Sequence, residues 1–80
     1  MKLGEKLKLL RKEKDLTLDK LAEMSGVAKA TLSRIENGVT SGNLNTHLKI
    51  CDALQVNLGE LYKGLESAEE KIVAFDEKTI

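Results

Sequence analysis

Residues 17–38 constrain the fold of this chain more than any other segment. They contain two short stretches in which apolar residues recur at helical spacing. Gly26 separates the two stretches and can adopt the positive φ that ends a helix. The apolar positions are Leu18, Leu21, Ala22, Leu32 and Ile35, with Val27 in the turn. Because Ala22 is small, the two helices can pack closely across a tight turn.

The second of these helices, predicted over residues 28–37, carries polar groups away from its apolar face. Helical spacing places Lys29, Ser33 and Arg34 on a different face from Leu32 and Ile35. In a helix-turn-helix this arrangement presents the second helix to the major groove of DNA. The segment therefore predicts binding to duplex DNA.

Composition limits the alternatives. Eighty residues make one small domain. The lack of proline and the few β-branched residues favour an all-α chain, and the two aromatic residues, Tyr62 and Phe75, leave the core to aliphatic side chains and Met. No apolar run approaches the roughly 20 residues that span a bilayer. Basic residues interrupt the leucines of residues 3–12, and Cys51 has no second cysteine to pair with. We expect a cytosolic protein that does not enter a membrane.

Charge is unevenly distributed, although the formal net charge is zero. Residues 1–40 hold nine Lys and Arg against six Asp and Glu, a net +3. Residues 41–80 hold four against seven, a net −3. The predicted helix-turn-helix lies in the positive half, which suits a surface that faces phosphates.

Three more helices complete the predicted domain. A leucine stripe (Leu3, Leu7, Leu10) marks a helix over residues 2–14. Asn43 and Asn57 are caps for helices over residues 44–54 and 58–63. In the first of these, helical spacing is kept by Leu44, Leu48, Cys51 and Leu54. We therefore expect a five-helix, all-α DNA-binding domain at residues 1–64, followed by a tail at residues 65–80.

The tail allows more than one interpretation. Ser67 and Glu70 have the spacing of a helix capping box, whereas residues 72–75 (Ile-Val-Ala-Phe) would also suit a strand. Apolar residues exposed together on a short tail are a liability unless they are covered. This favours pairing of residues 67–80 with a second subunit, and the alternative is that the tail leads into a further domain.

Four motifs occur in a fixed order along the chain. They are Leu21-Ala22, Ser25-Gly26-Val27, residues 31–38 (Thr-Leu-Ser-Arg-Ile-Glu-Asn-Gly) and residues 48–54 (Leu-Lys-Ile-Cys-Asp-Ala-Leu). Together they resemble the phage-repressor, Cro or Xre-type helix-turn-helix family over roughly residues 3–62. The resemblance implies a lambda-repressor-like fold and a transcriptional regulator.

The resemblance also implies base contacts from the helix at residues 28–37. The matching positions are Ala28, Lys29, Ala30, Ser33 and Arg34. Lys29 and Arg34 can donate to guanine or to phosphate, and Ala30 can touch a thymine methyl. Ala28 has only a methyl group, which cannot cap the helix.

Phosphate contacts are implied at a second set of positions: Arg11, Thr17, Asn37, Thr40 and Ser41. Simpler roles as a cap, a helix stop and loop residues remain open for the last four. Arg11 and Glu36 match a pair that in relatives forms an ion pair between the first and third helices, and the alternative is two unrelated solvated charges.

Two positions depart from the family pattern. Leu18 stands where many relatives have a Gln that contacts phosphate, and Gly42 stands where they usually have Pro. Leucine cannot make that contact, so either another group supplies it or affinity depends more on dimer formation. Gly42 leaves its loop more conformational freedom.

Catalysis and metal binding find little support. His47 and Cys51 are four residues apart on a helix, but two ligands do not make a structural zinc site. No third group orients them as a nucleophile pair. We expect no cofactor, no metal and no enzymatic activity.

The resulting hypothesis is a homodimeric transcriptional regulator, a repressor, on a near-palindromic operator, with its two recognition helices about 34 Å apart. Two alternatives share the fold: an activating restriction–modification controller, and an antitoxin whose fourth helix and tail hold a toxin. A third is a protein-interaction module that has lost DNA binding, for which Leu18, Ala28 and the zero net charge are the best support.

Overall fold

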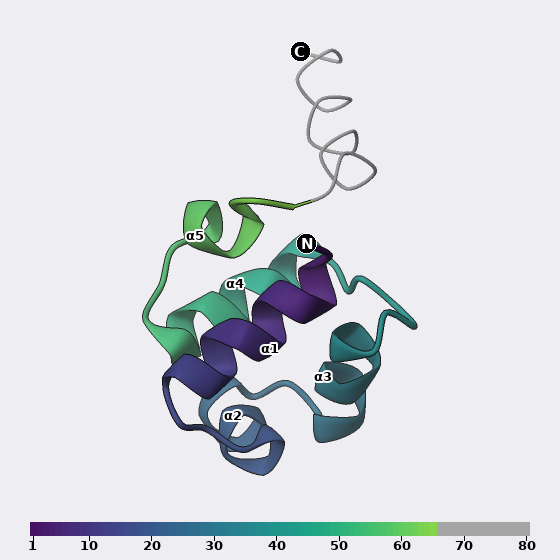
Figure 1. Ribbon diagram of the computed structural model, residues 1–80. Helices are drawn as coiled ribbons and strands as arrows, with labels where there is room; N and C mark the ends of the chain where they lie inside the picture. Colours follow the sequence, from purple (N-terminus) through teal and green to yellow (C-terminus); the bar gives the residue numbers. More distant parts are fainter. Residues whose placement is uncertain (66–80) are drawn as a thin grey trace.

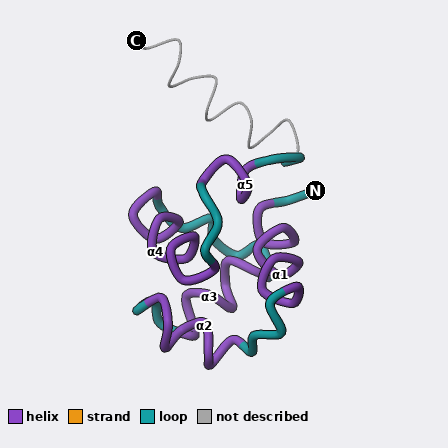
Figure 2. The backbone as a smooth tube through the Cα atoms, turned by 90° about the vertical axis from the view of Figure 1, so that its left-hand side faces the viewer, coloured by secondary structure: helices purple, strands orange, loops and turns teal. Residues whose placement is uncertain are grey.

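The computed structural model describes residues 1–65, which form five helices and no strand (Figures 1 and 2). The helices are α1 (Leu3–Glu13), α2 (Leu18–Ser25), α3 (Lys29–Glu36), α4 (Leu44–Leu54) and α5 (Leu58–Tyr62). The all-α fold class is confirmed, and the predicted ends of α1, α3, α4 and α5 differ from the observed ones by at most one residue. The expectations for residues 66–80 lie outside the described residues.

The helices form a closed ring around one core. α1 packs against α3 and α5, α2 packs against α3 and α4, and α4 packs against α5. In Figure 1, α5 lies at one end of the domain and α2 at the other. The largest fully buried side chains are Leu7, Leu21, Leu32, Ile35, Ile50, Leu54 and Leu61. Leu65 also joins the core, one residue beyond the expected domain boundary.

Side-chain caps begin three of the helices. The backbone N–H of Lys20 donates to Thr17 Oγ1 at 3.0 Å, and Asn43 and Asn57 accept in the same way at 2.9 and 2.8 Å. Ala28 makes no side-chain cap at the start of α3, as its methyl group requires. Gly26 ends α2 with φ of 75°. Thus capping residues close in the sequence set these helix boundaries.

The face of α4 that is buried is not the one that the leucine spacing predicted. Leu44 and Leu48 are 57% and 48% exposed, and the buried residues are instead His47, Ile50, Cys51 and Leu54. The helix is rotated so that residues 47, 50, 51 and 54 face the core, which carries Leu44 and Leu48 outward. A buried histidine is tolerated there because both ring nitrogens have hydrogen-bond partners.

Leu18, the residue in place of the family Gln, is half-buried and packs against the core. Its side chain therefore serves the packing of α2.

In the described part of the chain, no helix is long and apolar enough to cross a membrane.

Candidate nucleic-acid interface

α3 presents one face to solvent and the opposite face to the core. Leu32 and Ile35 are 0% and 1% exposed, whereas Lys29, Ala30 and Arg34 are exposed. Ser33 is half-buried on the same outer side, and Ala28 is exposed at the N-cap. Residues three and four positions apart lie on one side of a helix. The structure therefore brings the predicted base-contact residues together on the outer surface of α3.

An ion pair fixes the position of α3 relative to α1. Arg11 Nε and Nη2 donate to the two carboxylate oxygens of Glu36 at 2.7 and 3.0 Å, and Nη1 donates to the Leu16 carbonyl at 2.6 Å. The hydrogen bond to Glu36 raises the pKa of Arg11, against a smaller opposing effect of burial. The bidentate pair joins the C-terminal end of α3 to the end of α1.

The same contacts bear on the phosphate contact expected of Arg11. Its side chain is 10% exposed, and the bonds to Glu36 and Leu16 direct three of its N–H groups inward. A guanidinium has five N–H donors, so two remain for phosphate. The contact of Arg11 with DNA stays a prediction.

The other predicted phosphate residues lie at the surface. Thr17 is exposed at the start of α2, and Thr40 and Ser41 are exposed in the loop before α4. Asn37, at the end of α3, donates from Nδ2 to Ser33 Oγ at 3.3 Å. These residues flank α3 from its neighbouring helix and from the following loop, which is where backbone contacts beside a groove-bound helix would fall.

Sequence reasoning missed Asp19. Its Oδ1 lies 3.0 Å from Lys29 Nζ, with both side chains largely exposed. A carboxylate on α2 thus forms a surface ion pair with the cation at the start of α3. Asp19 lies in the first turn of α2 and Lys29 in the first turn of α3, so their contact depends on how the two helices pack, and no local pattern predicted it.

Comparison with known proteins identifies the domain. A helix-turn-helix family model matches residues 7–61, which includes α2, α3 and α4 in full. The chain belongs to the Xre-type helix-turn-helix family of transcriptional regulators. It is 36% identical over 77 residues to the HTH-type transcriptional regulator SlrR of Bacillus subtilis, with 95% of this chain and 51% of SlrR covered.

Further relatives of this helix-turn-helix domain agree with the assignment. The HTH-type transcriptional repressor RghR of Bacillus subtilis is 38% identical over 79 residues, with 94% of this chain and 58% of RghR covered. A solved structure of a complex of SinR protein and SinI protein is 33% identical with a TM-score of 0.73, and covers 96% of this chain and 80% of that one. The chain thus spans about half the length of SlrR and RghR.

His47 and Cys51 of this helix-turn-helix domain do not form a metal centre. His47 Nδ1 lies 2.7 Å from the Tyr62 hydroxyl and Nε2 lies 2.5 Å from the Ser41 carbonyl, so both nitrogens are engaged. Burial raises the pKa of the Cys51 thiol, which favours its neutral form over the thiolate that binds metals. Within residues 1–65, no group of three or more His, Cys, Asp or Glu could hold a metal ion.

Proposed function

We propose that this domain binds duplex DNA sequence-specifically and acts in the cytosol as a homodimeric transcriptional repressor. The observation that carries the proposal is the outer face of α3, where Lys29, Ala30 and Arg34 are exposed above the buried Leu32 and Ile35. In the proposed complex α3 lies in the major groove, with Lys29, Ser33 and Arg34 at base edges.

Contacts to the DNA phosphate backbone would fix the position of α3 along the major groove. Thr17 is exposed at the start of α2, and exposed residues also follow α3 in the chain (Asn37, Thr40 and Ser41). Arg11 retains two N–H groups beyond those it uses internally. Within residues 1–65, the Arg34 side chain has no hydrogen-bond or ion-pair partner and is available to a guanine or a phosphate. The repressor name of RghR supports the direction of regulation proposed.

A selection of bound sequences from random duplex DNA, at two salt concentrations, tests the proposal. Enrichment of a near-palindromic motif that survives moderate salt is the expected result, since base contacts add to the salt-sensitive phosphate term. The variant Lys29→Ala/Arg34→Ala should lose the motif. Lys63→Ala, which removes an exposed cation at the end of α5, should retain it.

A protein-interaction module without DNA binding is the second candidate function. The pairing of Asp19 with Lys29 favours it, because a negative charge beside the cation at the start of α3 reduces the positive potential there. Absence of any enriched motif, or binding equal on all sequences that disappears at moderate salt, would favour this candidate over a repressor.

A further inference from the structure

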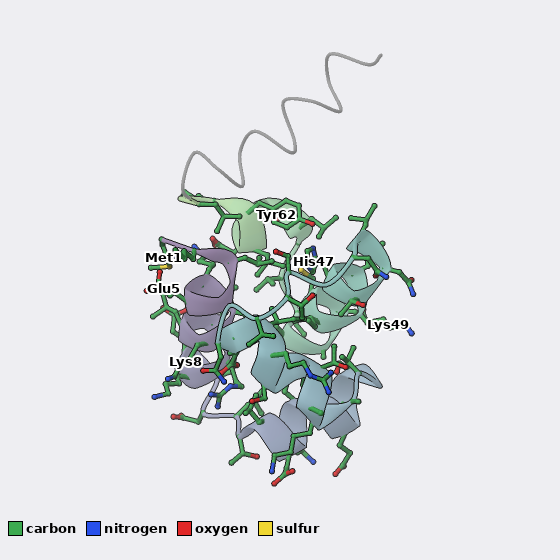
Figure 3. All side chains as sticks on the ribbon, turned by 90° about the vertical axis from the view of Figure 1, so that its right-hand side faces the viewer. Met1, Glu5, Lys8, His47, Lys49 and Tyr62 are labelled. Atoms are coloured by element: carbon green, nitrogen blue, oxygen red, sulfur yellow. The ribbon has the colours of Figure 1, made fainter. Side chains whose placement is uncertain are left out.

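The loop between α3 and α4 has a connection to the domain interior that the site described above does not use. His47 of α4 is 8% exposed, and its ring joins two other parts of the chain. Nε2 lies 2.5 Å from the backbone carbonyl of Ser41, and Nδ1 lies 2.7 Å from the Tyr62 hydroxyl. Figure 3 shows His47 and Tyr62 next to each other where α4 and α5 meet.

The chemistry of these partners sets the state of the ring. A backbone carbonyl only accepts hydrogen bonds, so the proton lies on Nε2. In the neutral ring Nδ1 is then an acceptor, and the Tyr62 hydroxyl donates to it. Burial raises the pKa of Tyr62, which keeps its phenol protonated as this role requires. The two rings also meet edge to face, with centroids 5.6 Å apart.

The imidazole ring of His47 contacts the middle of the loop between α3 and α4. At the start of the loop, the N–H groups of Val39 and Thr40 donate to the Arg34 carbonyl at 2.9 and 3.4 Å. At its end, Asn43 caps α4. Between these two points, the loop is held by a side chain from outside it through the hydrogen bond of His47 to the Ser41 carbonyl, within the described part of the chain. Gly42 has φ of 75°, and a Cβ there would lie 3.5 Å from His47 Nε2, so the chain turns closely over the ring.

We propose that His47 is a positioning residue of the DNA interface, which holds the Ser41 carbonyl so that Thr40 and Ser41 stand at the phosphate backbone, with the Tyr62 hydroxyl bound to the other ring nitrogen. This inference rests on the proposed function. Its physical basis is that a flexible glycine-containing loop must be ordered before it can bind phosphate, and a hydrogen bond formed beforehand removes that cost from binding.

A double-mutant cycle tests this proposal with the full chain. The variants are His47→Leu, a loop variant Thr40→Ala/Ser41→Ala, and their combination, with affinity measured on a duplex carrying the selected motif. His47→Leu should weaken binding about tenfold, because a loop that is no longer held would lose about one hydrogen bond from its hydroxyls to a charged phosphate. The combined variant should bind no more weakly than the weaker of the two, because the hydroxyls act only when the loop is held.

A conservative variant separates positioning from general stability. His47→Gln keeps a donor near the position of Nε2 and should restore most of the affinity, whereas His47→Leu keeps only the apolar bulk. The proposal is overturned if folded His47→Leu binds as the wild type does. It is equally overturned if the losses from His47→Leu and from the loop variant multiply in the combined variant.

Imidazole 15N shifts keep the proposal testable if His47→Leu does not fold. The wild type should show one tautomer with the proton on Nε2, and Tyr62→Phe, which removes only the hydroxyl, should keep that tautomer because the Ser41 carbonyl still requires a donor at Nε2. A wild-type ring protonated on Nδ1 alone would overturn the proposal. These spectra need no DNA, so a wild type that selects no motif would refute the proposed function without deciding whether His47 holds the loop.

Discussion

Arg11 and Glu36 form a buried ion pair between α1 and α3, in which two N–H groups of the guanidinium donate to the two carboxylate oxygens. The two side chains are 10% and 5% exposed, so water could solvate neither charge well if its partner were removed. Arg11→Ala would leave the Glu36 carboxylate buried without its bidentate partner. We expect the free energy of unfolding to fall by about 3 kcal/mol, as measured by urea denaturation.

The matched control for this pair is the double variant Arg11→Met/Glu36→Leu. It removes both charges and keeps most of the volume, so it should lose less stability than Arg11→Ala. If Arg11→Ala melts at the wild-type temperature, the ion pair does not join α1 to α3 in solution.

Asp19 should limit the affinity of the domain for DNA, because it pairs with Lys29 at 3.0 Å and adds a negative charge beside the proposed groove-facing helix. Asp19→Asn is expected to tighten binding to all duplexes a few-fold at low salt and to steepen the salt dependence. Titrations at several salt concentrations measure both effects. Asp52→Asn, an equal charge change at an exposed position on α4, should alter neither, and equal effects from the two variants would contradict a local role for Asp19.

At the scale of an element, Thr17 illustrates how one residue can serve a helix and a ligand. Its hydroxyl accepts the N–H of Lys20 at the start of α2 and is also exposed. Thr17→Ala should cost about 1 kcal/mol of stability through loss of the cap. Thr17→Asp keeps a good cap but places a negative charge toward phosphate, so stability should hold while DNA affinity falls. Parallel denaturation and binding measurements decide this, and unchanged affinity in Thr17→Asp would refute the phosphate contact.

Packing of α1 on the end of α3 depends on Gly4. A Cβ at this position would overlap the carbonyl oxygen of Ile35 and lie 2.7 Å from that of Glu36, and both obstacles are backbone. Gly4→Ala should therefore push the two helices apart and lower the free energy of unfolding by about 3 kcal/mol or more, despite its better helix propensity. Chemical denaturation measures this change.

Gly59, a second glycine within a helix, is the control for Gly4. A Cβ there meets only the Asn57 side-chain oxygen, at 3.2 Å, and this oxygen caps α5, so Gly59→Ala should cost at most about 1 kcal/mol through the cap, much less than Gly4→Ala. Equal losses at Gly4 and Gly59 would show that close approach of α1 to α3 is not the reason for Gly4.

Helix positions were predicted well because capping and spacing are local. Thr17, Asn43 and Asn57 supply hydrogen bonds to residues three positions ahead, and such signals can be read from a short window. The facing of α4 was predicted less well, because Leu44 and Leu48 keep helical spacing and yet are exposed. Which of two stripes on a helix turns inward depends on the neighbours that it meets.

For the whole molecule, the ring of five helices within residues 1–65 includes its own core, from Leu3 to Leu65. A chain ending at Leu65 should therefore keep the far-ultraviolet circular dichroism and cooperative melting of the domain. If residues 66–80 pair two subunits, as the sequence suggests, the shortened chain should sediment as a monomer and bind a full operator hardly better than a half-site. A shortened chain that still dimerises would place the subunit contact elsewhere.

The sequence by itself determined the five helices, their caps and the family, because spacing, capping residues and ordered motifs are properties of the chain read in order. It also indicated the residues that α3 turns outward, since burial of Leu32 and Ile35 leaves only one side for Lys29 and Arg34. Only the tertiary structure decided that Asp19 meets Lys29 and that His47 joins Ser41 to Tyr62. Those contacts depend on the relative placement of separate helices and loops, which arises from packing over the whole core and has no signature in a local window.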